Sequence, residues 1–479
     1  MLGRCTLSLA LIGLVACGGS DDIHPAGSQS SSSSSAGGAG GSGGTTSAGG
    51  SGGTPVDDPF AWEVTKGSCT LLYEIAGEAE NEYLGGTALG GDVDGDGTRD
   101  LFVASAFAIQ VRSGKDGALV EQRALEADEW VGLTELDHDV GTDGAPDIGA
   151  LRSRCETLGE GGGAVSSGDC VYDAEVLASD TADVVATMDH AIQIATVADR
   201  DANGKPDYAI TTDDAYVSSG DPTTVEIHSS ATLAVLSVIA PPAQESPWSY
   251  GTALRDAGDV NDDGKADLVM TITDLVGTLT GIHMHSGAND ALIWSDDLAV
   301  ASVPWGDRVI RLGDVDDDGA GDLLVNDHNA PAHGTVHAVS GRDGTVLWSD
   351  AFLYDNQLDE LGASGLHYGL ALAQGGDLDR DGKSDMLAGG SKPGFPIFFN
   401  GEGGAFRVLS AVDGSVLVEV QEVVDSEALE QDGFRFAASL SRLPDINGDD
   451  LDEIVVSAPR APHGATKAAG RVLVLSCTP

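Results

Sequence analysis

Short stretches in which apolar and polar residues alternate recur along the chain from about residue 68 onwards. In the clearest of them, Val336 and Ala338 are apolar and flank His337. Aligned stretches carry apolar residues at the first of these positions, namely Val336, Ile282, Ile109, Phe406, Val472 and Val225. Two residues later they carry Ala338, Met284, Val111, Val408, Val474 and Ile227. A period of two with one constant apolar face is typical of a strand in a packed sheet, so the pattern predicts a repeated β unit.

An acidic loop precedes each of these alternating stretches in the sequence. In one loop, Asp314, Asp316, Asp318 and Asp322 occupy positions 1, 3, 5 and 9, and Gly319 occupies position 6. Oxygen ligands at every second residue suit Ca²⁺, and the glycine allows the backbone to fold back around an ion. Without a cation, carboxylates this close in sequence would repel one another. The loop is therefore a predicted calcium site.

The acidic pattern occurs seven times, at intervals of 47 to 68 residues, which indicates a repeat array. Four further loops match closely, with candidate ligands Asp92, Asp94, Asp96 and Asp100; Asp199, Asp201, Asn203 and Asp207; Asp259, Asn261, Asp263 and Asp267; and Asp377, Asp379, Asp381 and Asp385. Two loops match less well, with candidate ligands Asp139, Asp143 and Asp147, and Asp445, Asn447, Asp449 and Glu453. In the first of these, Gly141 replaces a ligand and Asp137 is an alternative; in the second, Asp450 replaces the glycine. We expect about five to seven Ca²⁺ ions, with the two weaker loops left open.

The loops differ from EF-hands at their twelfth position, where an EF-hand has a bidentate glutamate and flanking helices. Here that position is apolar in every loop and lies in a strand-like run: Val103, Ala150, Ile210, Met270, Val325, Ala388 and Val456. The EF-hand interpretation is excluded.

Each unit has room for four strands, with the acidic loop between the first and the second. Four-stranded units arranged radially form a β-propeller, so we expect an all-β fold with seven blades. The last unit ends at Cys477 without a fourth strand, whereas an unassigned strand, Cys69–Ile75, precedes the first loop. We expect this N-terminal strand to complete the last blade and to bring Cys69 opposite Cys477.

The units resemble the FG-GAP/VCBS repeat of the integrin α-chain N-terminal β-propeller, a repeat also found in many bacterial surface proteins. Ser457-Ala458-Pro459 stands where that family has Gly-Ala-Pro, and the resemblance covers residues 68–479. It implies seven blades with Ca²⁺ loops clustered on one rim.

The N-terminus has the features of an export signal and a tether. Arg4 and the apolar run Leu7–Val15 are typical of a signal peptide over residues 1–16. Leu14-Val15-Ala16-Cys17 resembles a bacterial lipobox and implies lipidation at Cys17; an ordinary secretory signal is the alternative. Residues 17–58 are rich in glycine and serine and are expected to be a disordered tether to the propeller at 59–479. We therefore expect a lipoprotein anchored at a bacterial outer membrane or cell surface.

Four cysteines remain after the signal and the lipidated residue. Because an exported chain enters an oxidising compartment, we expect two disulfides, Cys69–Cys477 and Cys155–Cys170. His283, His285 and His337 lie on comparable strands; a metal site is conceivable, but packed or hydrogen-bonded positions are the preferred interpretation.

Charge and motifs narrow the function. A net charge of −53 argues against a nucleic-acid partner. The predicted propeller contains no G-x-S-x-G elbow, no H-E-x-x-H and no glycine-rich phosphate loop, which lowers the prior for an enzyme. We expect a non-enzymatic binding or adhesion module whose partner is a surface protein or glycan. The alternatives are a carbohydrate-active enzyme, such as a polysaccharide lyase, and a structural envelope lipoprotein.

Overall fold

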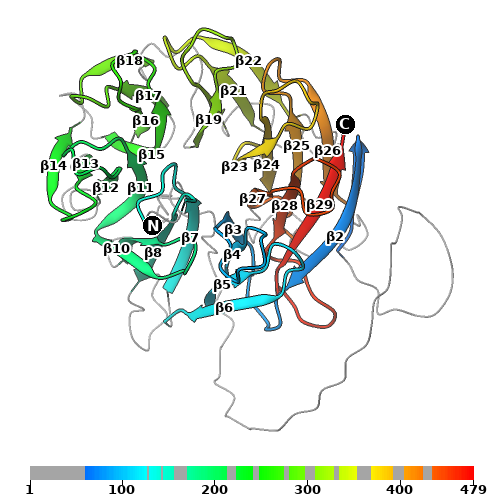
Figure 1. The fold of residues 1–479 in the computed structure, drawn as a ribbon. Coiled ribbons are helices and arrows are strands. Elements are labelled where there is room, and N and C mark those ends of the chain that lie inside the picture. The colour runs from blue at the N-terminus through cyan, green and yellow to red at the C-terminus, as the bar shows by residue number, and fades with distance from the viewer. Residues whose placement is uncertain are drawn as a thin grey trace, which may run out of the picture.

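The computed structural model is a ring of seven β-sheets (Figure 1). The structure describes residues 60–126, 129–141, 144–155, 170–212, 223–240, 248–274, 280–296, 308–327, 334–352, 368–391, 404–423 and 434–479. No helix occurs within these ranges, so none of the described residues forms a helix that could cross a membrane. The predicted propeller is confirmed. The predicted signal peptide, Cys17 and the tether lie outside the described residues, and the domain boundaries stay predictions.

Successive groups of four strands form the blades, as the sequence predicts. Blade one consists of β3 (Gly86–Leu89), β4 (Leu101–Ala104), β5 (Ala108–Arg112) and β6 (Leu119–Ala124). Blade two consists of β7 (Glu129–Glu135), β8 (Ile148–Cys155), β9 (Cys170–Leu177) and β10 (Val184–Asp189). Blade three consists of β11 (Ala191–Val197), β12 (Asp207–Thr212), β13 (Thr224–His228) and β14 (Val235–Ile239). Blade four consists of β15 (Trp248–Gly258), β16 (Asp267–Asp274), β17 (Thr280–His285) and β18 (Leu292–Asp296).

The remaining blades complete the ring. Blade five consists of β19 (Val309–Gly313), β20 (Asp322–Asp327), β21 (Thr335–Val339) and β22 (Val346–Ala351). Blade six contains β23 (Ala371–Gly376), β24 (Asp385–Ser391), β25 (Gly404–Leu409) and β26 (Val416–Glu422). Blade seven contains β27 (Leu440–Leu443), β28 (Glu453–Ala458) and β29 (Arg471–Thr478). The first strand of each blade lies nearest the centre of the ring (Figure 1).

The hydrophobic core lies between neighbouring blades. Every residue of the second strands β4, β20 and β28 is buried, because each of these strands has a neighbouring blade against both faces. One cluster joins Phe102 of blade one to Val131 and Ile148 of blade two. Removing a side chain the size of Phe102 from water contributes roughly 2–3 kcal/mol, so contact between blades is a main source of stability. Outer strands such as β6 are largely exposed.

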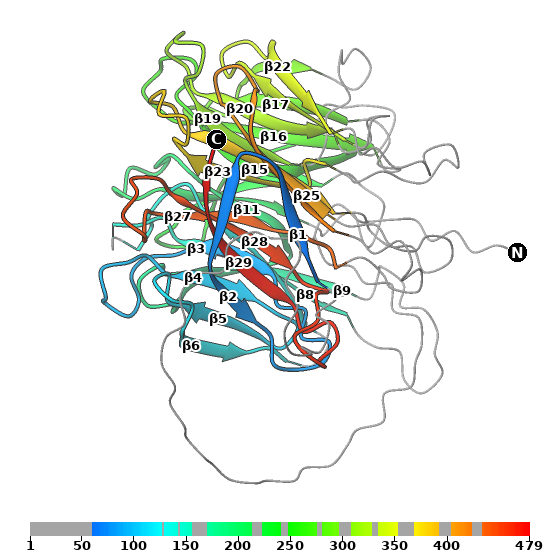
Figure 2. The same cartoon turned by 90° about the vertical axis from the view of Figure 1, so that its right-hand side faces the viewer.

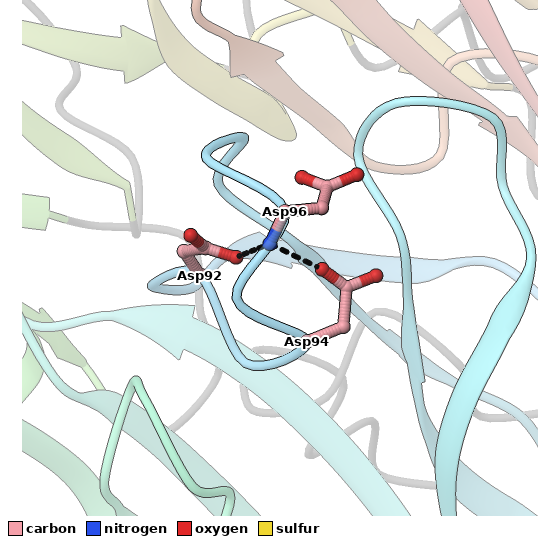
Figure 3. A group of neighbouring side chains, drawn as sticks. All are labelled: Asp92, Asp94 and Asp96. Carbon is pink, nitrogen blue, oxygen red and sulfur yellow. Dashed lines mark hydrogen bonds between the residues drawn. The ribbon is translucent and has the colours of Figure 1, made fainter.

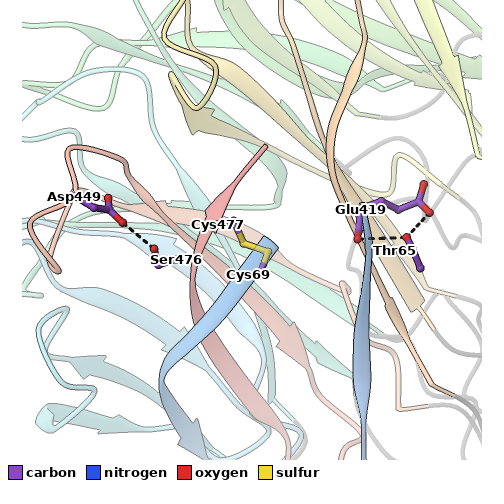
Figure 4. The surroundings of a disulfide bond; sticks show 6 residues. All are labelled: Thr65, Cys69, Glu419, Asp449, Ser476 and Cys477. Atoms are coloured by element: carbon purple, nitrogen blue, oxygen red, sulfur yellow. Dashed lines mark hydrogen bonds between the residues drawn. A yellow bond between two sulfur atoms is a disulfide. The ribbon is translucent and has the colours of Figure 1, made fainter. Parts of the chain in front are cut away.

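The N-terminal strand β2 (Ser68–Ala76) completes blade seven, as predicted. It runs antiparallel to β29, and Cys69 lies opposite Cys477. These two cysteines form a disulfide with a Cα–Cα distance of 4.1 Å (Figure 4). The predicted closure of the ring and the predicted disulfide are both confirmed.

A further strand, β1 (Trp62–Lys66), was not predicted. It pairs with the outer edge of blade six, with Val64 opposite Val420, and gives that blade a fifth strand. The Thr65 hydroxyl donates a hydrogen bond to Glu419 Oε1 at 2.6 Å (Figure 4). β1 and β2 are joined by a tight turn at Gly67, so the N-terminal segment bridges blades six and seven (Figure 2).

Blade two holds the other predicted cysteine pair. Its strands β8 and β9 pair up to Cys155, which lies opposite Cys170 in the register. The side chains of both cysteines lie outside the described residues, so this disulfide stays a prediction.

Candidate metal centres

The seven acidic loops each connect the first strand of a blade to the second, as the sequence predicts. In blade one, the Asp96 amide donates hydrogen bonds to Asp92 Oδ1 and Asp94 Oδ1, both at 3.0 Å (Figure 3). The Gly97 amide donates to Asp92 Oδ2 at 2.8 Å. The backbone therefore holds the loop curled, with its carboxylates converging.

The same backbone conformation recurs from loop to loop. In the six loops described in full, the residues at positions 4 and 6 have positive φ, for example 60° at Asp317 and 92° at Gly319. The loop of blade seven keeps this conformation although it has its glycine at position 4 and an aspartate at position 6. The φ angles are 86° at Gly448 and 66° at Asp450. Aspartate tolerates the left-handed region better than most residues, so the replacement of glycine by Asp450 does not disrupt the loop.

The acid at position 9 is buried and connects its loop to another turn of the same blade. Asp322 Oδ2 accepts a hydrogen bond from the Val315 amide at 2.8 Å, and Oδ1 accepts one from the Gly341 amide at 3.2 Å. Gly341 lies in the turn between the third and fourth strands. A Cβ there would lie 1.8 Å from the carbonyl oxygen of Gly321, which explains the glycine at this position of the blade-five turn. Asp100 and Asp267 make equivalent pairs of hydrogen bonds.

Carboxylate oxygens crowd together in four of the loops. Within each group, one oxygen from each residue lies within 4.8 Å of the others; the groups are Asp92, Asp94 and Asp96; Asp199, Asp201 and Asp207; Asp314, Asp316 and Asp322; and Asp377, Asp379 and Asp385. Three of these groups combine positions 1, 3 and 9 of the loop. In blade four, Asn261 occupies position 3 between Asp259 and Asp263 and supplies an amide oxygen in place of a carboxylate.

Burial makes the charge of the ninth residue costly. It raises the pKa of Asp322 to about 6, with a further contribution from Asp316 and Asp318. It raises the pKa values of Asp385 and Glu453 to about 7. Asp385 Oδ1 and Glu453 Oε1 are buried and accept no hydrogen bond from the described residues. Converging oxygens with unmet charge are the donor set that suits Ca²⁺, so these residues fit the predicted ion.

The two weaker loops differ from each other. In blade seven, Glu453 Oε2 accepts a hydrogen bond from the Ile446 amide at 3.0 Å. Glu453 therefore makes the contact that an aspartate makes at position 9 of the other loops. Asp449 accepts hydrogen bonds from Asn447 and from Ser476 of β29 (Figure 4).

In blade two, the Gly144 amide donates to Asp139 at 2.7 Å, and the Val140 amide donates to the buried Asp147 at 2.9 Å. Asp143 lies outside the described residues. Asp137, the alternative ligand, instead lines a cavity at the centre of the ring.

Lysines at position 7 join neighbouring loops. Lys205 Nζ donates to the Val140 carbonyl at 3.0 Å, and Lys265 Nζ donates to the Asp199 carbonyl at 2.6 Å. Lys383 Nζ donates to the Asp314 carbonyl and to Asp317 Oδ1. Each contact crosses from one blade to the preceding one, so these lysines connect the acidic loops of blades two, three and four and those of blades five and six.

The three histidines are buried in their blades. The Tyr250 hydroxyl lies 2.8 Å from His283 Nδ1 and 3.0 Å from His285 Nε2, and His337 Nδ1 lies 2.7 Å from Ser349 Oγ. Burial lowers the pKa of His285 and lowers that of His337 to about 4. These contacts are those of hydrogen-bonded core residues, in line with the preferred interpretation.

A cavity of about 470 Å³ lies at the axis, lined by the innermost strands of all seven blades. Five arginines border it, and the sequence reasoning missed them. A signal was present, because Arg255, Arg311 and Arg442 stand three or four residues before the first aspartate of their acidic loops.

Comparison with known proteins supports the repeat in one blade. A sequence model described as "FG-GAP repeat" matches residues 436–475, which span most of blade seven. No curated protein sequence matches the chain. Among solved structures, "Crystal structure of BBS1N in complex with ARL6DN, soaked with lead" is similar at 10% sequence identity, with 87% of this chain and 97% of that chain covered and a TM-score of 0.44.

Proposed function

We propose that the protein is a calcium-stabilised, non-enzymatic binding module of the cell surface, with a surface glycan or protein as its partner. The observation that carries the calcium part is the rim of acidic loops, with carboxylate oxygens within 4.8 Å of one another in four of them. The FG-GAP match in blade seven is compatible with an adhesion-type module. Export through residues 1–16 and anchoring at Cys17 belong to the same proposal.

The acidic loops would hold Ca²⁺ through positions 1, 3, 5 and 9, and the ion would supply the positive charge that the crowded carboxylates lack. Residues of the chain itself fix the shape and the attachment of each loop. Backbone amides such as that of Asp96 curl each loop before any ion is needed. The ninth residue fixes the loop to the outer hairpin of its blade, and the lysines at position 7 join one loop to the next. A filled rim would therefore be a more rigid platform, with lysine contacts joining the loops of blades two to four and those of blades five and six.

Stoichiometry and stability test the calcium part. The purified protein, stripped of metal with a chelator, is titrated with Ca²⁺ by isothermal calorimetry, and bound metal is counted by elemental analysis. We expect five to seven ions per chain and a higher melting temperature with Ca²⁺. A melting temperature that does not change between chelator and Ca²⁺ contradicts a structural role for the ion.

A binding screen tests the adhesion part. Arrays of surface polysaccharides and surface proteins are probed with the fluorescently labelled protein in Ca²⁺, and again in chelator. We expect specific partners that are lost in chelator. No specific partner in either condition would refute the binding module, and depolymerisation of an arrayed polysaccharide would favour the enzyme alternative.

A further inference from the structure

We propose that the cavity at the axis of the ring binds a small dianion, a molecule carrying two carboxylate-type groups. The proposal rests on the binding function proposed above, and it gives that function a site and a ligand chemistry. No acidic loop is needed for it, because the cavity is formed by the innermost strands.

The lining reverses the charge balance of the chain. Over the whole sequence, 77 acidic residues face 24 lysines and arginines. Among the described residues that line the cavity, the acids are Glu135 and Asp137. The basic residues of the lining are Arg99, Arg255, Arg308, Arg311 and Arg442. Five guanidinium groups against two carboxylates leave a formal excess of three positive charges in a protein of net charge −53.

These charges interact with one another. Burial raises the pKa of Glu135, while the Leu89 amide and then Arg99, Arg442 and Arg255 lower it. Burial likewise raises the pKa of Asp137, and Arg255 and Arg311 act against that rise. The two acids and most of the arginines therefore form one electrostatic cluster.

Some of the arginines are already neutralised by partners. Arg311 Nη1 lies 3.4 Å from Asp256 Oδ1, and Arg442 Nη1 contacts Asp452 Oδ2. These ion pairs account for two of the five guanidinium groups without using Glu135 or Asp137, so three guanidinium groups remain against those two carboxylates, a formal excess of one positive charge.

Arg255 and Arg308 are different. Arg255 donates to the Thr134 hydroxyl at 2.8 Å and to the Leu254 carbonyl at 3.0 Å. Arg308 Nε donates to the Leu370 carbonyl at 3.2 Å. All of these acceptors are neutral, and neither arginine forms an ion pair with any residue in the described part of the chain. Each guanidinium keeps further N–H donors that these bonds do not use.

The two guanidinium groups also act on each other. Burial lowers the pKa of Arg255; Asp137 opposes this, and Arg308 lowers it further. Confining like charges away from bulk water is unfavourable unless an anion compensates them. A carboxylate matches the planar fork of a guanidinium with two parallel hydrogen bonds. A ligand with two such groups would supply charged hydrogen-bonding partners for Arg255 and Arg308, whose acceptors are otherwise neutral.

The size and the neutral part of the lining also suit a small molecule. The volume of about 470 Å³ falls within the roughly 300–1,000 Å³ of known small-molecule sites. Gln193, Gln374, Thr87 and Ser439 add uncharged hydrogen-bonding groups. They could bind hydroxyl groups on the body of the ligand while the arginines bind its acidic ends.

The experiment uses simple dicarboxylates as probes. Malonate, succinate, glutarate and adipate are titrated into the full protein by isothermal calorimetry, in Ca²⁺ and at low ionic strength, with glutaramide as the neutral counterpart of glutarate. We expect at least one dicarboxylate to bind and glutaramide not to bind. If no dicarboxylate binds more tightly than glutaramide, the proposal is overturned.

Variants locate the site. We expect Arg255→Met and Arg308→Met each to weaken dicarboxylate binding about tenfold or more, because each removes a charge-assisted pair of hydrogen bonds. The matched control is Arg123→Met, which removes an arginine of the outer strand β6 that pairs with Glu175 of β9. It should change binding by less than about twofold. Equal losses in all three variants would indicate a general charge effect and overturn the proposal. Arg308→Gln provides a second test if a methionine variant does not fold.

The outcomes separate this inference from the proposed function. If arrayed partners bind but no dicarboxylate does, the cavity site is wrong and the surface module stands. If dicarboxylates bind through Arg255 and Arg308 but no arrayed partner does, the cavity site stands and the surface module is wrong.

Discussion

Lys265 Nζ donates a hydrogen bond to the main-chain carbonyl of Asp199 at 2.6 Å. The two residues belong to the acidic loops of blades four and three, 66 residues apart in sequence. The contact fixes the position of the residue that opens the neighbouring loop. The acidic loop that accepts such a lysine is therefore held from two sides, by its own blade and by the next one.

We expect Lys265→Met to lower the free energy of unfolding by about 1 kcal/mol, because it removes a charge-assisted hydrogen bond between blades. Chemical denaturation in Ca²⁺ measures the change. The control is Lys115→Met, since Lys115 is largely exposed and lies 3.6 Å from Asp96 within its own blade. That variant should stay within about 0.5 kcal/mol of the wild type. Equal effects of the two substitutions would show that the contact between loops has no special role.

Replacing the buried Asp385 should have opposite effects with and without calcium. In Ca²⁺, Asp385→Asn removes a charged ligand, so we expect one bound ion fewer and a lower melting temperature. In chelator, the same substitution removes a buried charge close to Asp379 and Asp381, so the melting temperature should stay equal or rise. The control is Asp262→Asn, at the exposed fourth position of another loop, which should change neither quantity. A loss of stability in chelator as large as that in Ca²⁺ would argue against ion binding at this loop.

Removing the disulfide should be among the most destabilising changes in the chain. Cys69 and Cys477 are 408 residues apart, and chain-entropy estimates for a loop of this length reach about 6 kcal/mol. We expect the double variant Cys69→Ala/Cys477→Ala to unfold with a free energy lower by about 3–6 kcal/mol, measured in denaturant. Both cysteines are buried, so alanine avoids placing a polar group there. A reductant should then affect the wild type far more than the variant, and any effect left in the variant would report on Cys155 and Cys170. Equal stability of variant and wild type would show that strand pairing alone closes the ring.

His337 should make the protein sensitive to acid. Its pKa is lowered to about 4 by burial, whereas an exposed histidine has a pKa of about 6.5. As the pH falls below 6.5, the unfolded chain binds a proton that the folded chain refuses until about pH 4, so stability is lost across this window. The shift corresponds to about 3 kcal/mol at its low-pH end.

Denaturation curves at pH 7.5, 6 and 5 of the wild type and of His337→Gln measure this contribution. We expect the variant to lose less stability on acidification, after allowance for its lower stability at pH 7.5. The same substitution at the exposed His463 is the matched control. Parallel loss of stability in wild type and His337→Gln would contradict a neutral, buried His337.

Much of the fold follows from local sequence because each blade repeats the same units. The acidic loops mark the connection between the first two strands, and alternating residues such as Val336 and Ala338 mark the third. The sequence pattern does not predict strand β1, because this short edge strand has to bury only one face. The strand is defined by its pairing with β26. Periodicity alone cannot locate such a partner.

The cavity could not be predicted from alternation for a different reason. Bulges interrupt the register between Asp256 and Gly258 and between Arg311 and Gly313. Each bulge shifts which residues face the axis just before an acidic loop. A strict period of two therefore cannot tell whether Arg255 or Asp256 lines the cavity.

Strand β2 has a consequence for biosynthesis. A ribosome makes Cys69 early and its partner Cys477 408 positions later, so the nascent strand has no permanent neighbour until synthesis of the propeller is nearly finished. An unpaired strand edge invites pairing with other chains. Cells that make this protein would need to shield that edge in the meantime, and a translation product cut short before β29 would be prone to aggregate.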